Sequence, residues 1–424
     1  MSNLLPNGWT SSQLSELGSV KTSSVDKKSV DGELPVKLLN YMDVYRNNFI
    51  TSKINLQNVT AKPNQVEASS LRVGDVLFTP SSETPDDIGH SAVVMEDIDK
   101  MVYSYHLMRF RDESGKLDNS FKGYAFKTNE IYKQFYKQAT GSTRFTLSVG
   151  EVEKTVVIYP EDKKEQKKIA EVLSSVDEVI ELTEKEISKL QDLKKGMMQE
   201  LLTKGIGHTK FKDSPVGKIP EKWDYLSLDE VTTKIQDGNY GASYPKSDEF
   251  TQSGVPFLTS AAIGGGNHII RKKVKYIPSK KHEELKKAHI KNGDVLFTNR
   301  GANVGSVAYV EDWLDGGNIG PQLTLLRAKK EISSRYLFLL MSSDFLSEQI
   351  NKLDSGSAMN FFGIGTTKTF MFPFPKFEEQ ELIYEKINPV SDIIRFKSKC
   401  LYRLTNLKKG LMQDLLTGKV RVKV

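Results

Sequence analysis

The sequence predicts a mixed α/β chain of the α+β type, in which two pseudo-twofold-related globular segments are separated by two long antiparallel coiled-coil-like helices. Three observations predict this fold class. Long motifs recur at an offset of 214 residues, and an apolar heptad pattern follows each globular segment. The globular segments hold short β-branched and aromatic runs bounded by Gly, Asn, Ser and Pro. A chain of 424 residues that is 38% hydrophobic can fill two or three domain cores.

The tandem repeat is clearest at its helical end. LKKGMMQELLT, which starts at Leu193, recurs as LKKGLMQDLLT at Leu407, with nine of eleven positions identical. A Glu-Gln pair at 165–166 returns at 379–380, the tryptophan of LPNGW returns in IPEKW, and GDVLFT occurs in both copies. We therefore expect a globular segment at 1–158, a helical segment at 159–204, a linker at 205–218, a second globular segment at 219–375 and a second helical segment at 376–424.

Each helical segment carries an apolar seam in alternating steps of four and three, as in a coiled coil. Residues 161–205 hold eleven acidic and nine basic side chains, and residues 376–424 hold six and eleven, so opposite net charges favour pairing of the two helices. If the repeats obey a pseudo-twofold axis, as duplicated units commonly do, this pairing is antiparallel and the globular segments lie at opposite ends. The alternative is that each helix packs only on its own globular segment. The predicted pairing residues are Ile180, Ile187, Leu190, Met197, Leu201, Ile394, Leu401, Leu404, Leu411 and Leu415.

The helix starts are predicted from capping residues. Pro389 is tolerated at a first helical position and disrupts a helix interior, so we expect Asn388 to cap the second long helix. Ser174 takes the same place in the first copy. A short separate helix is expected before each cap.

The cysteine count and the hydropathy predict the compartment. Cys400 is the only cysteine, so the chain cannot form an intramolecular disulfide or a multi-cysteine zinc site, which favours a reducing environment. No apolar run approaches the roughly 18 residues that cross a bilayer. We expect a cytoplasmic protein without a membrane partner.

Positive charge is concentrated in one stretch of the second globular segment. His268 to Asn292 holds nine basic and two acidic residues, a larger surplus than the net charge of +6 of the whole chain. Lys and Arg neutralise DNA phosphates without reading sequence, so the stretch predicts a contact with the DNA backbone, and a solvated face is the alternative. We expect a helix over Lys280 to Lys287, and we expect His282 and His289 to form a solvated helix pair.

Polar loops beside predicted strands are candidates for reading bases. Residues 299–303 (NRGAN) directly follow the second GDVLFT, and residues 238–241 (GNYG) form another turn. Arg can bind guanine and Asn can bind adenine in bidentate fashion, although ordinary turn chemistry is the alternative for any one side chain. The loop after the first GDVLFT is chemically different, which indicates two different targets. The candidate DNA-binding residues are Tyr41, Arg46, Ser81, Ser82, Thr84, Arg144, Asn239, Tyr240, Lys272, Lys273, Lys275, Arg300, Asn303 and Asn360.

Sequence signatures of catalysis are missing. The six histidines form no HExxH motif, Gly363 to Lys368 lacks the phosphate-loop spacing, and no amino-methyltransferase motif is found. We expect a DNA-binding chain with no catalytic residues, no metal site and no cofactor of its own.

The order of these motifs resembles that of the specificity (S) subunit of type I restriction-modification systems, over essentially the whole chain. The resemblance implies two target recognition domains, each reading one half of a bipartite asymmetric double-stranded DNA site, and a helical spacer that sets the gap. It also implies two methyltransferase (modification) subunits that use S-adenosylmethionine to methylate adenine N6, and restriction subunits that use ATP and Mg. A stand-alone DNA-binding regulator and a structural coiled-coil adaptor remain the alternatives.

Overall fold

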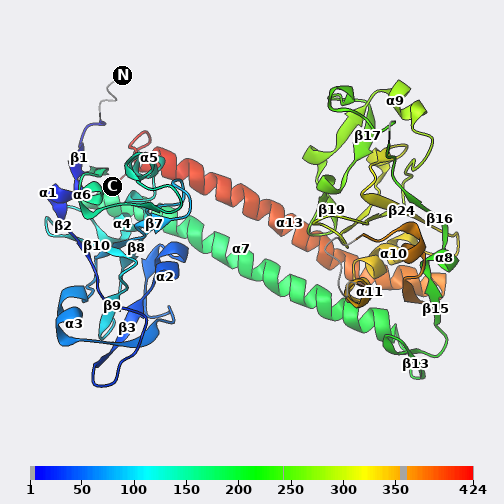
Figure 1. Ribbon diagram of the computed structural model, residues 1–424, viewed down its shortest axis with the longest axis horizontal. Helices are drawn as coiled ribbons and strands as arrows, with labels where there is room; N and C mark the ends of the chain where they lie inside the picture. The colour runs from blue at the N-terminus through cyan, green and yellow to red at the C-terminus, as the bar shows by residue number, and fades with distance from the viewer. Residues whose placement is uncertain (1–4, 242, 354–360, 424) are drawn as a thin grey trace. The chain divides into compact units, whose positions relative to one another are not determined.

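A computed structural model describes residues 5–241, 243–353 and 361–423 of the chain (Figure 1). The backbone falls into two compact units. Unit 1 is Met1–Lys185 with Ser398–Val424, and unit 2 is Glu186–Lys397. Each unit therefore combines one globular segment with a part of each long helix, and each has its own hydrophobic core.

The globule of unit 1 is centred on a five-stranded sheet with the strand order β2-β10-β6-β8-β4. The central strand β6 is the first GDVLFT motif, and each of its residues is buried because neighbouring strands lie on both sides. Phe78 of β6 packs edge-to-face on Phe126, at the end of one short helix, and on Phe135, within the next, and all three rings belong to the core. The elements are β1 (Trp9–Gln13), α1 (Leu14–Leu17), β2 (Gly18–Thr22), β3 (Leu34–Leu39), α2 (Tyr41–Arg46), β4 (Phe49–Ile50), β5 (Gln57–Ala61), α3 (Pro63–Ser69), β6 (Val76–Phe78), β7 (Ser81–Ser82), β8 (Ser91–Val94), β9 (Met101–Tyr103), β10 (Met108–Asp112), α4 (Asn119–Ala125), α5 (Asn129–Gln138), β11 (Phe145–Thr146), α6 (Val149–Glu153) and β12 (Val156–Pro160).

The globule of unit 2 repeats this plan with a four-stranded sheet in the order β16-β24-β21-β22, in which β21 is the second GDVLFT strand. Residues 334–353 form two helices, with a break at Ser342 and Ser343. The elements are β13 (Phe211–Ser214), β14 (Gly217–Pro220), β15 (Asp224–Ser227), α8 (Leu228–Val231), β16 (Thr232–Asp237), β17 (Val255–Leu258), β18 (Ile263–Gly264), β19 (His268–Ile269), β20 (Lys275–Ile277), α9 (Ser279–Glu284), β21 (Val295–Thr298), β22 (Val307–Tyr309), β23 (Asn318–Ile319), β24 (Leu323–Ala328), α10 (Ser334–Met341), α11 (Asp344–Leu353), α12 (Ile364–Lys368) and β25 (Met371–Phe374), with 3₁₀ turns η1 (Ser247–Glu249), η2 (Ser260–Ala262), η3 (Arg271–Lys273) and η4 (Asp312–Leu314).

The buried aspartate of each GDVLFT motif binds a half-buried arginine from the neighbouring strand. In unit 1, the Nε and Nη2 of Arg111 on β10 donate to the two Asp75 oxygens at 2.7 and 2.6 Å. In unit 2, Arg327 on β24 makes the same two bonds to Asp294 at 2.8 Å each. Both carboxylates are 2% exposed. The repeated motif is therefore a structural clamp between two strands.

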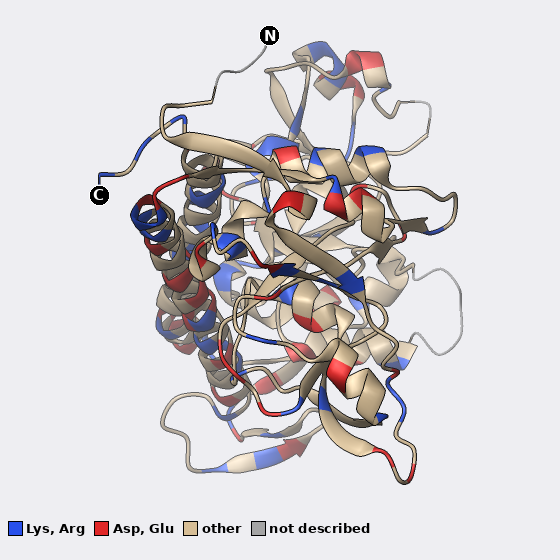
Figure 2. Ribbon diagram, turned by 90° about the vertical axis from the view of Figure 1, so that its left-hand side faces the viewer, with Lys and Arg blue, Asp and Glu red and all other residues tan. Residues whose placement is uncertain are grey.

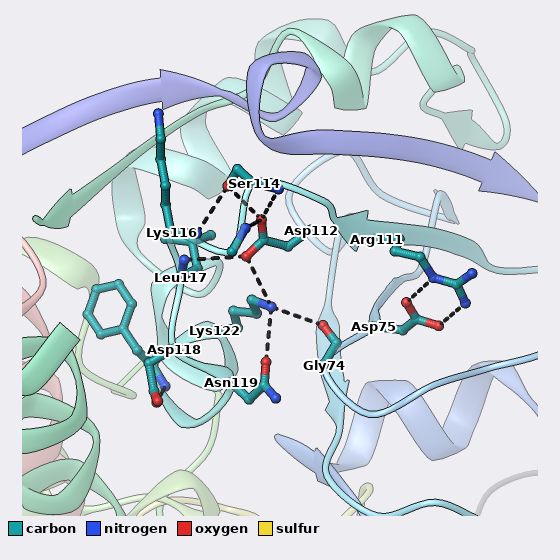
Figure 3. A network of polar contacts seen from close by, with 12 residues as sticks. Gly74, Asp75, Arg111, Asp112, Ser114, Lys116, Leu117, Asp118, Asn119 and Lys122 are labelled. Atoms are coloured by element: carbon teal, nitrogen blue, oxygen red, sulfur yellow. Dashed lines mark hydrogen bonds and ion pairs between the residues drawn. The ribbon is translucent and has the colours of Figure 1, made fainter.

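A second polar network in unit 1 fixes the turn from β10 to α4 (Figure 3). The Asp112 carboxylate is 1% exposed and accepts the backbone N–H of Ser114 at 3.1 Å and of Leu117 at 3.3 Å. It also forms an ion pair at 3.3 Å with Lys122, which points toward it from α4. Lys122 donates in addition to Asn119 Oδ1 at 3.0 Å, so this nearly buried ammonium group is well satisfied.

The two long helices are α7 (Lys163–Lys204) and α13 (Phe377–Leu415). In unit 1, Lys408 of α13 pairs with Asp177 of α7 at 2.5 Å, and in unit 2, Lys397 pairs with Glu186 at 2.6 Å. Arg421, past the end of α13, binds Glu165 near the start of α7, so the helix segments in unit 1 run antiparallel. Figure 2 shows positive and negative residues interspersed along the long helices. None of the predicted pairing residues is fully exposed. Leu415 is buried, at 4% exposed, and the half-buried ones are Ile180, Ile187, Leu190, Met197, Leu201, Ile394, Leu401, Leu404 and Leu411.

The predicted helix starts at Ser174 and Asn388 are wrong. Both positions lie inside the continuous helices, and Pro389 is an internal residue of α13. Proline removes one N–H donor and leaves the carbonyl of the residue four positions earlier without its helical bond. Pro389 and Glu385 are both exposed, so water can satisfy that carbonyl, while the buried Ile383 and Ile387 hold the preceding turns against the core of unit 2.

The repeated Glu-Gln pair anchors the start of each long helix. Gln166 is buried, donates to the carbonyls of Lys116 and Pro160, and accepts the N–H of Asp118 at 2.7 Å. In unit 2, the equivalent Gln380 accepts the N–H of Ser333 at 2.8 Å. The glutamine thus ties the long helix to its globule by satisfying backbone groups that would otherwise be buried without partners.

The predicted fold class is confirmed: two mixed α/β globules alternate with two long helices. The stretch expected as a linker contains an ordered hairpin, in which Phe211 to Ser214 pairs with Gly217 to Pro220. Among the described residues, no helix has both the length and the apolar character needed to cross a membrane.

Candidate nucleic-acid interface

Unit 1 contains an open cleft of about 800 Å³ beside the end of the first GDVLFT strand. Its walls come from the start of α2, the strand β7 and the segment that leads into β11, which are far apart in sequence. The cleft brings together five of the residues predicted to bind DNA. They are Tyr41, Ser81, Ser82, Thr84 and Arg144, and the sixth candidate in this unit, Arg46, is exposed at the end of α2 outside the cleft lining.

Hydrogen bonds hold the cleft in shape. The hydroxyl of Tyr41 donates to the carbonyl of Ser81 at 3.0 Å, and the side chain of Ser82 donates to the carbonyl of Thr84. Arg144 is exposed and its guanidinium reaches the Ser81 hydroxyl at 3.4 Å, which is a long contact that leaves most of its donors free. Arg144 can therefore present a bidentate fork to a base edge or a phosphate.

The cleft carries charges of both signs, because Glu83 and Asp87 line it as well as two cations. Lys27 and Arg144 line it together with His106. Burial lowers the pKa of His106, and the charges of Lys27 and Arg144 lower it further. His106 is therefore neutral at physiological pH, so its ring can offer one donor and one acceptor to a base edge.

Sequence reasoning missed part of this cleft. Lys27, Tyr45 and His106 line it and were not predicted. The ring of Tyr45 lies against that of His90 in a tilted arrangement with centroids 4.4 Å apart, and Asp87 accepts from His90 at 2.8 Å. In the sequence, only the Lys27-Lys28 pair indicates a charged binding site. The other residues come from separate turns, which become neighbours only when the chain folds.

In unit 2, the equivalent loop after GDVLFT is fixed by a buried asparagine. Asn299 is fully buried, and its amide donates to Asp237 at 3.0 Å and to the Thr324 hydroxyl at 2.9 Å. Next to it, the guanidinium of Arg300 lies over the Phe361 ring at 4.4 Å. Asn299 thus shapes the loop, and the half-buried Arg300 is positioned by cation–π stacking. Asn303 is exposed farther along the same loop.

The other predicted loop of unit 2 divides into a structural residue and an exposed one. Asn239 is 3% exposed and its amide donates to the carbonyl of Lys287 at 2.8 Å. This bond and the burial hold the Asn239 side chain inside the fold, and its contact with a base stays a prediction. Tyr240 is 62% exposed and the ammonium of Lys287 lies 4.0 Å from its ring centroid.

The lysine-rich stretch is only partly available to DNA. Lys272 and Lys273 are exposed on the turn η3, and Lys275 is exposed over the ring of Phe250. Lys281 is 9% exposed and pairs with Glu249 at 2.9 Å and with Glu284, so its charge is neutralised. The stretch therefore contributes fewer free charges than its sequence indicates.

Two further expectations for this stretch are wrong. The helix α9 ends at Glu284, before Lys286 and Lys287. His282 and His289 are half-buried and stacked at 4.5 Å, and His282 Nδ1 lies 2.6 Å from Asn318 Oδ1. They form part of the packing between α9 and β23. Asn360, also predicted to bind DNA, lies outside the described residues.

Comparison with known proteins identifies the family. The family model described as the type I restriction modification DNA specificity domain matches twice, at residues 6–192 and 220–406. The chain belongs to the type I restriction-modification specificity subunits. In both copies, the specificity-domain match covers one globular segment and most of the helix that follows it.

Named specificity subunits are among the similar sequences. The type I restriction enzyme MjaVIII specificity subunit of Methanocaldococcus jannaschii is 28% identical over 329 residues, which are 76% of this chain and 75% of that protein. The putative type I restriction enzyme MjaX specificity subunit of the same organism is 30% identical over 370 residues, covering 85% and 82%.

Solved structures share the fold of this specificity subunit. The S subunit of a type I restriction-modification system from M. genitalium has a TM-score of 0.60 at 14% identity, covering 98% of this chain and 97% of that one. A chain from a study of complex assembly and conformational transition of the type I R-M system has a TM-score of 0.55 at 19% identity, covering 98% and 100%.

Within the described residues, no group of three or more His, Cys, Asp or Glu side chains could hold a metal ion.

Proposed function

We propose that this chain reads a bipartite, asymmetric DNA site with one half per globule, as the non-catalytic specificity subunit of a type I restriction-modification complex. The observation that carries the proposal is the combination of a repeated scaffold with unlike loops. The Asp75–Arg111 clamp and the Asp294–Arg327 clamp hold the same strand pair in both units. The loops that leave these strands carry serines in unit 1 and Arg300 in unit 2.

The chemistry of each loop suits a different base sequence. Arg144 in unit 1 and Arg300 in unit 2 can each bind guanine O6 and N7, while neutral His106 can donate to or accept from a base edge. Lys272 and Lys273 are exposed cations that can contact phosphates, which fixes register without reading sequence. An adenine N6 inside the stack is out of reach, so a partner methyltransferase must flip the base while this chain holds the duplex.

Repeated apolar positions on the long helices support docking of two copies of one partner. Val179 and Leu182 on α7 are 46% and 60% exposed, and their repeat equivalents Ile393 and Phe396 on α13 are 45% and 68% exposed. Leu193 and Leu407 are a third such pair, at 52% and 53%. Large apolar side chains exposed in register on both helices are typical of a protein interface. We assign them to two modification subunits, with S-adenosylmethionine on those subunits and with ATP and Mg on restriction subunits.

The test is expression with the neighbouring methyltransferase subunit, followed by sequencing of methylated motifs. We expect a two-part adenine-methylation motif in the wild type. Arg144→Ala should relax one half of the motif and Arg300→Ala the other, each by about 1–3 kcal/mol of discrimination at one base pair. Lys21→Ala, an exposed lysine on β2 outside the cleft lining, is the matched control and should leave the motif unchanged.

The rival functions predict other outcomes. A stand-alone regulator would bind DNA without the methyltransferase and give no methylation motif. A coiled-coil adaptor would bind no DNA. If either arginine substitution alone relaxed the base preference in both halves of the motif, the assignment of one half to each globule would be contradicted.

A further inference from the structure

The short helices of the two units correspond residue by residue at an offset of 215. Gln134 of α5 exchanges two hydrogen bonds with the backbone of Val156, at 3.0 and 2.8 Å, and Gln349 of α11 makes the same two bonds with Met371, at 3.0 and 2.8 Å. The long helices correspond at an offset of 214. These offsets make Lys127 equivalent to Ser342, Tyr124 to Leu339, Asp177 to Ser391 and Lys408 to Lys194.

In unit 1, these positions form a filled polar site between globule and helices. Asp177 pairs with Lys408 at 2.5 Å and accepts from the Tyr124 hydroxyl at 2.9 Å and from the Asn48 amide at 3.2 Å. Lys127 donates to Asn48 Oδ1 at 2.5 Å. The half-buried carboxylate at the centre thus has a cation and two neutral donors around it, which replace the water that it has lost.

In unit 2, the same place is a pocket of about 430 Å³. Ser391 stands where unit 1 has the carboxylate, and Ser342 stands where unit 1 has Lys127. The Ser342 hydroxyl is buried with no hydrogen-bond partner, and no ion pair joins Lys194 to an acid among the residues that the structure describes. Burial lowers the pKa of Lys194, with Arg395 adding in the same direction.

The walls of this pocket are amphipathic. Met198, Leu202, Val216 and Phe345 supply apolar surface around Lys194. Ile394 also lines the pocket and follows Ile393, one of the exposed apolar residues assigned above to partner docking. The pocket is therefore continuous in sequence with the proposed docking surface.

We propose that this pocket of unit 2 receives an acidic side chain, carried on an apolar segment of the modification subunit, whose carboxylate binds Lys194 and Ser342. The incoming carboxylate takes the place that Asp177 fills in unit 1. This inference rests on the proposed function. It makes the two docking sites unequal, since the equivalent position in unit 1 is already occupied by the chain's own side chain.

Two acids at the rim do not oppose this binding. Asp344 is 53% exposed and pairs with Lys195 at 3.7 Å, and Glu348 is exposed. Exposed charges are screened by water and salt, whereas the desolvated Lys194 interacts more strongly with a carboxylate brought next to it.

The experiment measures assembly of the full chain with the modification subunit by mass photometry over a concentration series. We expect wild type to bind two copies. Lys194→Met should bind one copy as before and the second about tenfold or more weakly, the loss expected for one charge-assisted bond. Ser391→Asp should weaken the same step, because it supplies Lys194 with an internal carboxylate. Lys189→Met, an exposed lysine of α7 outside the pocket, is the matched control.

The assembly measurements distinguish a failure of the proposed function from a failure of the inference about the pocket. Wild type that binds no modification subunit would overturn the proposed function and this inference together. Wild type that binds two copies, with both pocket variants unchanged, would overturn the inference alone. A third outcome is that octanoate stabilises wild type but not Lys194→Met, while assembly is unchanged in the variants. This outcome would assign the pocket to a small carboxylate and would also refute the inference. Thermal unfolding of each variant verifies that it is folded.

Discussion

Replacing the GDVLFT aspartates by asparagine tests whether the two globules share one structural clamp. Asp75 accepts the bidentate fork of Arg111 and the backbone N–H of Arg72 at 2.9 Å. Asp294 accepts the fork of Arg327 and the N–H of Lys291 at 2.8 Å. Asparagine keeps the shape, but its NH₂ group faces a donor in any orientation and the arginine loses its counter-charge.

The expected cost follows from burial. The two carboxylates are 2% exposed, and Arg111 and Arg327 are 21% and 25% exposed. Removing one partner of a buried pair costs about 3–5 kcal/mol, and the lower end applies here because the arginines keep some contact with water. A loss of about 3 kcal/mol corresponds to a roughly 150-fold increase in the population of the opened globule.

Hydrogen exchange measured by mass spectrometry distinguishes the units. Asp75→Asn should speed exchange in peptides over β6 and β10 and leave those over β21 and β24 unchanged, and Asp294→Asn should do the reverse. The two effects should agree within about 1 kcal/mol, because the geometries match. A cost below about 1 kcal/mol in either unit, or one that differs strongly between units, would refute the shared clamp.

Three further predictions concern DNA binding, pH and the spacer. Lys272→Glu with Lys273→Glu should weaken DNA binding and reduce the slope of log K against log salt by about 2, and a gel-shift titration with an unchanged slope would contradict the phosphate assignment. Burial lowers the pKa of Lys127 to about 8, below its unfolded value, so the unfolded chain binds more protons and stability should rise from pH 8 to 9.5 by up to about 2 kcal/mol. Lys127→Met should lose this rise in denaturant unfolding. Inserting four residues near Ile187, about 6 Å of helix, should change the accepted spacer, and methylome data showing altered half-sites with the old spacer would argue against it.

Local patterns in the sequence were read correctly where the physics is local. The heptad seam follows side-chain periodicity and the GDVLFT strands are short continuous apolar runs, and the order of residues contains both patterns directly. The sequence predicts a helix start at Asn388 because a proline normally ends a helix, whereas α13 continues through Pro389. Packing of Ile383 and Ile387 on unit 2 outweighs that local cost, and a local rule does not include such packing.

The candidate interface was predicted in part for the same reason. Ser81, Thr84 and Arg144 were chosen from loop chemistry, and the structure gathers them in one cleft. Asn239 was chosen by the same chemistry, yet it bonds a carbonyl 48 residues away inside the fold. Whether a loop asparagine faces a ligand or its own backbone depends on a contact that sequence spacing does not encode.

The sequence by itself determined the duplication, the two helical seams, the unlike loops and the family resemblance, because each is a pattern along the chain. Tertiary structure decided which charged side chains form ion pairs inside the protein. It paired Lys281 with Glu249 and Lys408 with Asp177, and within the described residues it gave the equivalent Lys194 no acid. Burial and ion pairing depend on which segments meet in space, so two lysines at equivalent positions of the repeat have different chemistry.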